Sequence, residues 1–172
     1  VRHASKARVK TGFMKDGTIK AMDLKLYTNT GAYATSALNV AGAMSHKVFK
    51  AYKIDNMRFH VNPVYTNCPT AGAMRGYGIP QVCFAIESFM DDIAFEIGMD
   101  PLEFRRKNLI RGYYEDAYLK PIAAHTNGIF ECLDKGAAYI HWEEKRKAYA
   151  NQTGSVRRGV GMALFSYKTG VW

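Results

Sequence analysis

The chain has 172 residues, of which 48% are hydrophobic and 23% charged, and it carries a formal net charge of +9. This length and composition suit one globular domain and exclude a disordered or fibrous chain. No apolar run approaches the roughly 20 residues that cross a bilayer, so we expect no membrane span. The Lys and Arg residues form only short, mixed stretches without a nucleic-acid-binding motif, so we expect no nucleic acid partner.

The first predicted element is a β-hairpin. Residues 7–14 and 18–27 flank the turn Lys15-Asp16-Gly17, and Asp-Gly is a strong hairpin signal. Apolar and polar side chains alternate along the second strand, which predicts a sheet that is covered on one side.

Small side chains dominate residues 28–50, and the pattern there assigns no secondary structure. Such a segment suits close packing against another backbone or a cofactor. Residues 52–65 resume strand character, which Pro63 interrupts near the end of the run.

The loop at residues 69–81, with the sequence PTAGAMRGYGIPQ, is the most informative feature of the chain. Gly72, Gly76 and Gly78 permit positive φ angles and close backbone approach. Amides at the start of the following helix would form a site for an anion or an oxo group. Glycine-rich turns before helices also occur without a ligand, so the residues alone leave both interpretations open.

Pro80 lies in the first turn of a predicted helix, where proline costs no needed hydrogen-bond donor. Apolar residues recur at three- and four-residue spacing along this helix, and Glu87 lies off that stripe. We expect Gly98 to end the helix. Asp100 and Pro101 predict the N-cap and first position of a second, short helix.

Two further elements follow toward the end of the chain. A third helix is expected from about residue 128 to 151, and a strand over residues 159–167. Strands followed by helices predict an α+β domain, with a β-hairpin and mixed sheet against packed helices. We expect residues 1–172 to form a fragment of one domain, without an internal boundary.

The three cysteines indicate a reducing compartment, and we expect a cytoplasmic protein. Cys68, Cys83 and Cys132 are widely spaced and form no CxxC pair, which argues against a disulfide framework and a zinc or iron–sulfur site in this chain. Cys83 and Cys132 are expected on buried helix faces, and Cys68 lies beside the glycine-rich loop.

The order of motifs from residue 69 to residue 108 resembles the molybdopterin-binding subunit of the xanthine dehydrogenase and aldehyde oxidase family. Three shorter motifs extend the resemblance toward the start of the chain: ARVKTGF at 7–13, DGTI at 16–19 and TGAY at 30–33. The resemblance implies part of a molybdopterin-binding domain. It also implies oxidative hydroxylation of an N-heteroaromatic compound or an aldehyde, with oxygen from water.

The resemblance further implies which residues bind the cofactor, molybdenum held by molybdopterin, with the dinucleotide form as one option. The implied cofactor-binding residues are Gly72, Ala73, Met74, Arg75 and Gly76. At Arg75 the family approaches the molybdenum centre through the backbone amide. The residue type alone equally allows a side-chain pair with a phosphate or a substrate carboxylate.

Two positions concern the substrate. Tyr77 matches an aromatic ring that sandwiches a flat substrate in the family, whereas the sequence alone equally allows a tyrosine of the core. Ala43 aligns where xanthine-specific members carry an arginine, so the resemblance disfavours a mainstream xanthine oxidase. His46 or Lys47 could replace that arginine or be structural.

Other parts of the implied enzyme have no counterpart in this chain. The resemblance calls for a glutamate base and a glutamine-containing loop beside the molybdenum centre, and we find neither motif. We therefore expect no catalytic residue here and an inactive isolated fragment. The rest of the molybdopterin subunit would complete the site, and 2Fe-2S and FAD on partner domains or subunits would carry the electrons. The alternative is a non-catalytic structural or assembly module that retains the fold.

Overall fold

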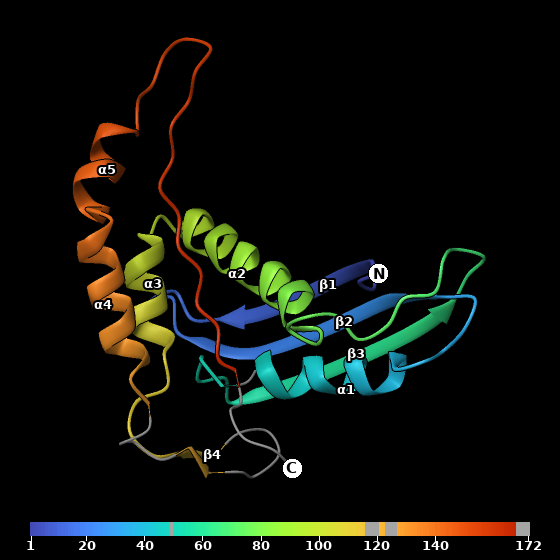
Figure 1. Ribbon diagram of the computed structural model, residues 1–172. Helices are drawn as coiled ribbons and strands as arrows, with labels where there is room; N and C mark the ends of the chain where they lie inside the picture. Colours follow the sequence, from blue (N-terminus) through green and yellow to red (C-terminus); the bar gives the residue numbers. More distant parts are fainter. Residues whose placement is uncertain (49, 116–120, 123–126, 168–172) are drawn as a thin grey trace.

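The structure is a computed structural model that describes residues 1–172 except 49, 116–120, 123–126 and 168–172. In the described part of the chain, a three-stranded sheet packs against helices (Figure 1). A separate short antiparallel pair consists of β4 (Tyr114–Glu115) and β5 (Pro121–Ile122).

The main sheet has the order β1-β2-β3, with bounds Ser5–Phe13, Ile19–Gly31 and Asn56–Tyr65. β1 runs antiparallel to β2 and β3 runs parallel to it, which confirms both the hairpin and the mixed sheet. Gly17 has a φ of 84° in the hairpin turn, as the Asp-Gly signal requires. The third strand begins later than predicted, because Tyr52 instead forms an isolated bridge with Leu109.

One face of the sheet is covered, as the alternation along β2 predicts. Met22, Leu24 and Leu26 are buried, whereas Lys25 and Tyr27 are exposed. Two helices lie over the buried face: α1 (Ala37–Val48) and α2 (Ile79–Glu96) (Figure 1). The sequence pattern assigned no secondary structure to residues 28–50, and α1 lies within this segment.

The junction between α2 and α3 (Pro101–Asn108) confirms the predicted caps. Gly98 adopts a φ of 67° just after α2, and the following amide of Met99 donates to the carbonyl of Ala94 over 2.8 Å. The Asp100 carboxylate then accepts a hydrogen bond from the amide of Leu102, also over 2.8 Å. These bonds satisfy backbone groups that a helix end leaves unpaired.

The predicted single helix over residues 128–151 is wrong, because two helices occupy it: α4 (Ile129–Tyr139) and α5 (Trp142–Ala148). His141 between them has a φ of 55°, which interrupts helical hydrogen bonding. The turn brings the Trp142 ring into the core, where its Nε1 donates to the Asp100 carboxylate over 3.1 Å.

The predicted strand over residues 159–167 is also wrong. The exposure of these residues alternates as in a strand, but within the described residues they join no sheet. Val160, Met162 and Leu164 instead pack against the helical side of the core, and the segment runs alongside α2 (Figure 1). Period-two alternation reports an extended chain with one buried face, whether a sheet or a helix covers that face.

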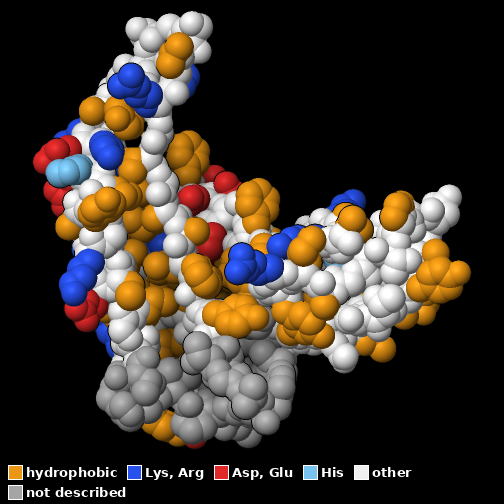
Figure 2. Space-filling view, viewed as in Figure 1, with side chains coloured by type: hydrophobic (Ala, Val, Ile, Leu, Met, Phe, Trp, Pro, Cys, Tyr) orange, Lys and Arg blue, Asp and Glu red, His pale blue; other side chains and the backbone are white. Residues whose placement is uncertain are grey.

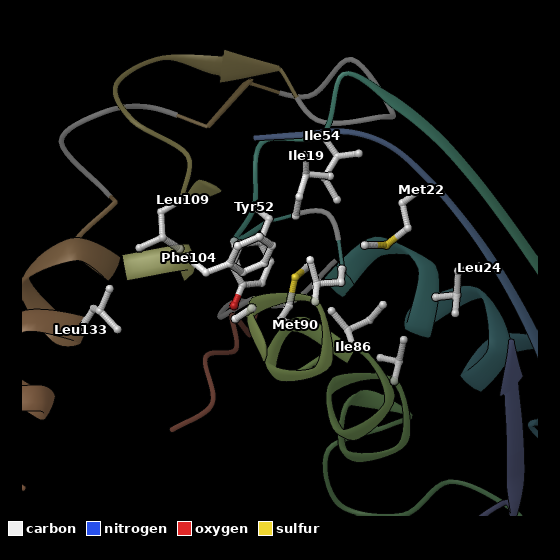
Figure 3. Packing of buried hydrophobic residues seen from close by; sticks show 14 of the residues in the cluster. Ile19, Met22, Leu24, Tyr52, Ile54, Ile86, Met90, Phe104, Leu109 and Leu133 are labelled. Carbon is white, nitrogen blue, oxygen red and sulfur yellow. The ribbon is translucent and has the colours of Figure 1, made fainter. Parts of the chain in front are cut away.

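The hydrophobic core lies between the sheet, α2 and α3 (Figure 3). Ile86 and Met90 from α2 belong to this core together with Phe104 from α3 and the Tyr52 ring. Leu133 joins the same core from α4.

The core contains an ion pair that the sequence pattern did not predict. Glu87 is only 5% exposed, although it lies off the apolar stripe, and the Arg105 side chain is fully buried. Arg105 Nε donates to Glu87 Oε2 over 3.0 Å, and the Tyr52 hydroxyl donates to Glu87 Oε1 over 2.7 Å. Glu87 is buried because these donors take the place of water around its carboxylate.

The expected burial of two cysteines is wrong. Cys83 is only half-buried on α2, and Cys132 is exposed on α4. The buried faces of these helices carry their immediate neighbours Val82 and Leu133, and adjacent helical residues point about 100° apart.

Replacing Glu87 by Ala tests the buried ion pair. The change leaves Arg105 charged without its buried partner, so we expect a loss of about 3–5 kcal/mol of stability. Calorimetry of the full-length protein measures the resulting fall in the unfolding midpoint. The matched control is Glu96→Ala, at an exposed position of the same helix. Equal midpoints for the two variants would contradict this account of the core.

Candidate functional site

The glycine-rich loop connects β3 to α2 and winds tightly into the helix; we call residues 69–78 the cradle loop. Gly76, Tyr77 and Gly78 have φ angles of 93°, 45° and 94°, so three successive residues are left-handed. The Tyr77 amide donates to the carbonyl of Met74 over 2.7 Å, and the Ile79 amide donates to the carbonyl of Gly76 over 2.9 Å. The loop therefore forms consecutive turns that need glycine at two of the three positions.

The close approach of the loop to α1 gives a second reason for glycine at position 78. A Cβ atom there would lie 2.6 Å from Met44 Cγ and 3.0 Å from the Val40 carbonyl oxygen, both on α1. At the other end of the loop, a Cβ on Gly31 would lie 2.4 Å from the carbonyl oxygen of Pro69. The cradle loop is thus seated between α1 and the end of β2.

The first half of the cradle loop is tied to the rest of the domain. The buried Ala71 donates its amide to the Thr30 carbonyl and accepts a bond from the Thr35 hydroxyl, each over 2.9 Å. The Gly72 amide donates to the carbonyl of Val1 over 3.1 Å. The small side chains of residues 28–50 therefore allow the close packing against another backbone that the sequence indicates.

The middle of the cradle loop faces solvent. Ala73, Met74 and Arg75 are all exposed, and within the described part of the chain their backbone amides donate to no protein acceptor. The loop thus offers consecutive N–H donors in an exposed segment of the chain. A run of backbone donors without protein acceptors can bind an anionic or oxo group.

Tyr77 lies at the boundary between the cradle loop and the core. Its side chain is half-buried and packs against the hydrophobic cluster. The contact agrees with the structural interpretation of Tyr77, while its position beside the exposed amides suits the substrate-lining one, which stays a prediction.

The interpretations of Ala43 and of His46 or Lys47 as substrate-related positions also stay predictions. Ala43 is half-buried, next to the Met44 that contacts Gly78. The side chains of residues 46–48, with the candidates His46 and Lys47, lie outside what the structure describes.

Cys68 is exposed just before the cradle loop. Hydrogen bonding with Thr66, and then with Asn29, lowers the pKa of its thiol below the ordinary value. Within the described residues no group of His, Cys, Asp or Glu side chains is arranged to hold a metal ion. A search of the same residues finds no helix with the length and apolar character of a membrane span.

Sequence reasoning missed the residues that support the cradle loop from the start of the chain. Arg2 donates from Nη2 to the Arg75 carbonyl over 2.9 Å, and Gln81 donates from Nε2 to the carbonyl of His3 over 3.2 Å. These contacts join positions more than 70 residues apart, and no local pattern marks them.

Apart from the buried Arg105, the described Lys and Arg residues are exposed or half-buried. On the face shown in Figure 2, Lys and Arg side chains lie among hydrophobic and acidic ones. Several also pair with carboxylates, such as Arg106 with Asp134 over 2.7 Å and Lys107 with Asp16 over 3.0 Å.

A family model described as the molybdopterin cofactor-binding domain matches residues 1–109, the part that contains the sheet, α1, the cradle loop and α2. The chain belongs to the molybdopterin cofactor-binding domain family. The resemblance read from the motifs is therefore confirmed.

Relatives and solved structures agree with this assignment. A putative xanthine dehydrogenase molybdenum-binding subunit of Escherichia coli is 41% identical over 99% of this chain. The aldehyde oxidase 2 of Mus musculus is 32% identical over 96% of the chain. The aldehyde oxidoreductase of Desulfovibrio gigas aligns over 88% of the chain with a TM-score of 0.74 and 30% identity, which confirms the α+β fold of a molybdopterin-binding domain.

The matched regions are parts of much longer proteins. The chain spans 23% of the Escherichia coli relative, 13% of the Mus musculus relative and 16% of the Desulfovibrio gigas chain.

Replacing Gly78 by Ala tests the geometry of the cradle loop. A side chain at this positive φ costs about 1–3 kcal/mol, and the contact with α1 adds to it. We expect a lower unfolding midpoint of the full-length protein. Gly42→Ala is the control, because a Cβ there meets open space within α1 and should be neutral or stabilising. A midpoint for Gly78→Ala equal to that of the control would contradict the proposed packing.

Proposed function

We propose that the cradle loop binds molybdopterin in a molybdenum hydroxylase, and that the whole protein oxidatively hydroxylates an N-heteroaromatic compound or an aldehyde. The observation that carries the proposal is the exposed run of amides at Ala73, Met74 and Arg75, which donate to no protein acceptor among the described residues. Membership of the molybdopterin cofactor-binding domain family supports the same cofactor.

The residues present fit such a cofactor. The molybdenum cofactor carries phosphate and oxo groups, and backbone N–H donors are well suited to both. A Cβ on Gly76 would lie 2.8 Å from Pro80 Cδ, so glycine there lets the loop turn closely into α2. The guanidinium of Arg2 adds a positive charge at the Arg75 carbonyl. The backbone donors and the positive charge therefore both favour an anionic or oxo group.

In this proposal each part of the loop has a separate role. Gly72, Ala73, Met74 and Gly76 contact the cofactor, and the backbone amide of Arg75 donates toward the molybdenum centre while its exposed side chain stays outside that contact. The ring of Tyr77 lines the substrate position, and its packing against the core holds it in place. When bound, the cofactor supplies the redox chemistry of the hydroxylation.

We propose that none of the described carboxylates acts as the catalytic base. Glu87 is buried and accepts bonds from Arg105 and Tyr52, so it has no path to a substrate at the cradle loop. Asp100 caps α3 and binds Trp142. The base would then come from sequence outside these residues, and the 172-residue fragment alone would be inactive.

The remaining parts of the proposed assembly are a continuation of the molybdopterin subunit and partner domains or subunits with 2Fe-2S and FAD. The description of the Escherichia coli relative as a molybdenum-binding subunit supports such a division. We propose that residues 1–172 lie in one domain, since one core cluster joins β2 to α5. The cysteine pattern supports a cytoplasmic location.

A pair of variants tests the role of the Arg75 amide. Arg75→Ala keeps the backbone donor, whereas a glycine inserted between Ala73 and Met74 shifts every donor after it. We expect the insertion to abolish most molybdenum binding and the substitution to reduce it less than about twofold, since each retained contact is a backbone bond. Metal analysis of the purified full-length variants measures both. Mild and equal losses would contradict an amide contact.

The function as a whole is tested on the natural full-length assembly. We expect bound molybdenum and pterin, and oxidation of a purine, a nicotinate-like ring or an aldehyde with an artificial electron acceptor. A folded assembly with neither molybdenum nor pterin would overturn the proposal and favour a non-catalytic module.

A further inference from the structure

Arg2 joins the start of the chain to two sides of the cradle loop. Its Nη2 atom donates to the Arg75 carbonyl over 2.9 Å, and its Nη1 atom lies 3.5 Å from Oε1 of Gln81 in the first turn of α2. The same guanidinium lies near Gly76, because a Cβ built on Gly76 would be 4.0 Å from Nη1. One planar cation therefore contacts the loop on both sides of its left-handed turns.

The segment that carries Arg2 is itself anchored. The carbonyl of His3 accepts a bond from Gln81 Nε2 over 3.2 Å. The buried His3 ring donates from Nδ1 to the Asn29 carbonyl over 2.8 Å, since a carbonyl can only accept. The Val1 carbonyl accepts from the Gly72 amide. Arg2 is thus held from β2 and from α2, and it has little freedom to leave the loop.

Holding the Arg75 carbonyl has a consequence for the amide that shares its peptide bond. In a planar trans peptide the carbonyl and the next N–H point in opposite directions, so the bond to Arg2 sets the direction of the Gly76 N–H. A charge-assisted bond to the carbonyl also polarises the peptide and strengthens its N–H as a donor.

We propose that Arg2 is a positioning residue of the cofactor site. It orients the Arg75–Gly76 peptide and supplies positive charge behind the loop. The inference rests on the proposed function for the identity of the bound group. The effect of Arg2 on the loop itself is independent of that identity.

The geometry requires arginine rather than any cation. The fork of the guanidinium reaches Arg75 and Gln81 at once, whereas an ammonium on a single stem presents one point charge. Lysine at this position would keep the charge and lose the bridge.

Hydrogen exchange of the full-length protein tests the effect on the loop without requiring the cofactor. The amides of Tyr77 and Ile79 are protected by the turns of the loop. We expect them to exchange at least about tenfold faster in Arg2→Ala, since a bond to a charged group is lost. The Arg8→Ala control, exposed on β1, should exchange like the wild type at these amides. Unchanged exchange in Arg2→Ala would overturn the inference.

Cofactor properties of the same variants test the effect on the site. In Arg2→Ala we expect an altered electron paramagnetic resonance signal of reduced molybdenum and kcat lowered about tenfold, with KM changed less than about twofold. Arg2→Lys should give an intermediate kcat. An unchanged signal and kcat in a loaded Arg2→Ala variant would overturn the inference and leave the proposed function intact. A wild type without molybdenum would overturn the proposed function, while the exchange result would still decide the role of Arg2 in the loop.

Discussion

The carboxylate of Glu87 connects four parts of the chain inside the core. It accepts bonds from the Tyr52 hydroxyl, from Arg105 Nε on α3 and from the Leu164 amide, the last over 2.9 Å. Burial, and then the negative charge of Glu87, raise the pKa of Tyr52 well above its ordinary value, so its hydroxyl stays a donor. Burial acts to lower the pKa of Arg105, but the neighbouring Tyr52 and Glu87 have a larger opposite effect. The pKa is therefore raised above its ordinary value, and the guanidinium stays charged.

This interaction matters for the site because Glu87 lies on α2, the helix that begins at the cradle loop. A buried ion pair adds little net stability over an apolar pair, but a mismatched partner is costly, so the pair selects one arrangement of α2 and α3. Gly78 then sets how closely α2 approaches α1. The core contact and the close approach together place the left-handed turns, and the exposed amides of residues 73–75 follow from those turns.

Local signals in the sequence predicted the parts of this arrangement that depend on local geometry. The Asp16-Gly17 turn, the Gly98 end of α2 and the Asp100 cap each follow from the φ angles and hydrogen bonds that neighbouring residues require. The cradle loop was visible for the same reason, because glycine at positions 76 and 78 permits positive φ.

The features that the sequence did not predict depend on contacts between residues far apart in the chain. Glu87 looked solvated because its partner Arg105 belongs to another helix, and no local pattern marks Arg105 as buried. The support of the cradle loop by Arg2 has no local signal at all. The turn at His141 was not predicted because the hydrogen bond that favours it, from Trp142 to Asp100, joins residues 42 positions apart.

A crystal structure of the full-length protein purified with its cofactor would test the central claim most directly. We predict molybdopterin against the cradle loop, with the amide of Arg75 within hydrogen-bond distance of a ligand of the molybdenum and the Arg75 carbonyl still bound to Arg2. A cofactor bound elsewhere, or a cradle loop whose amides at residues 73–75 donate to protein acceptors in the complete chain, would contradict it.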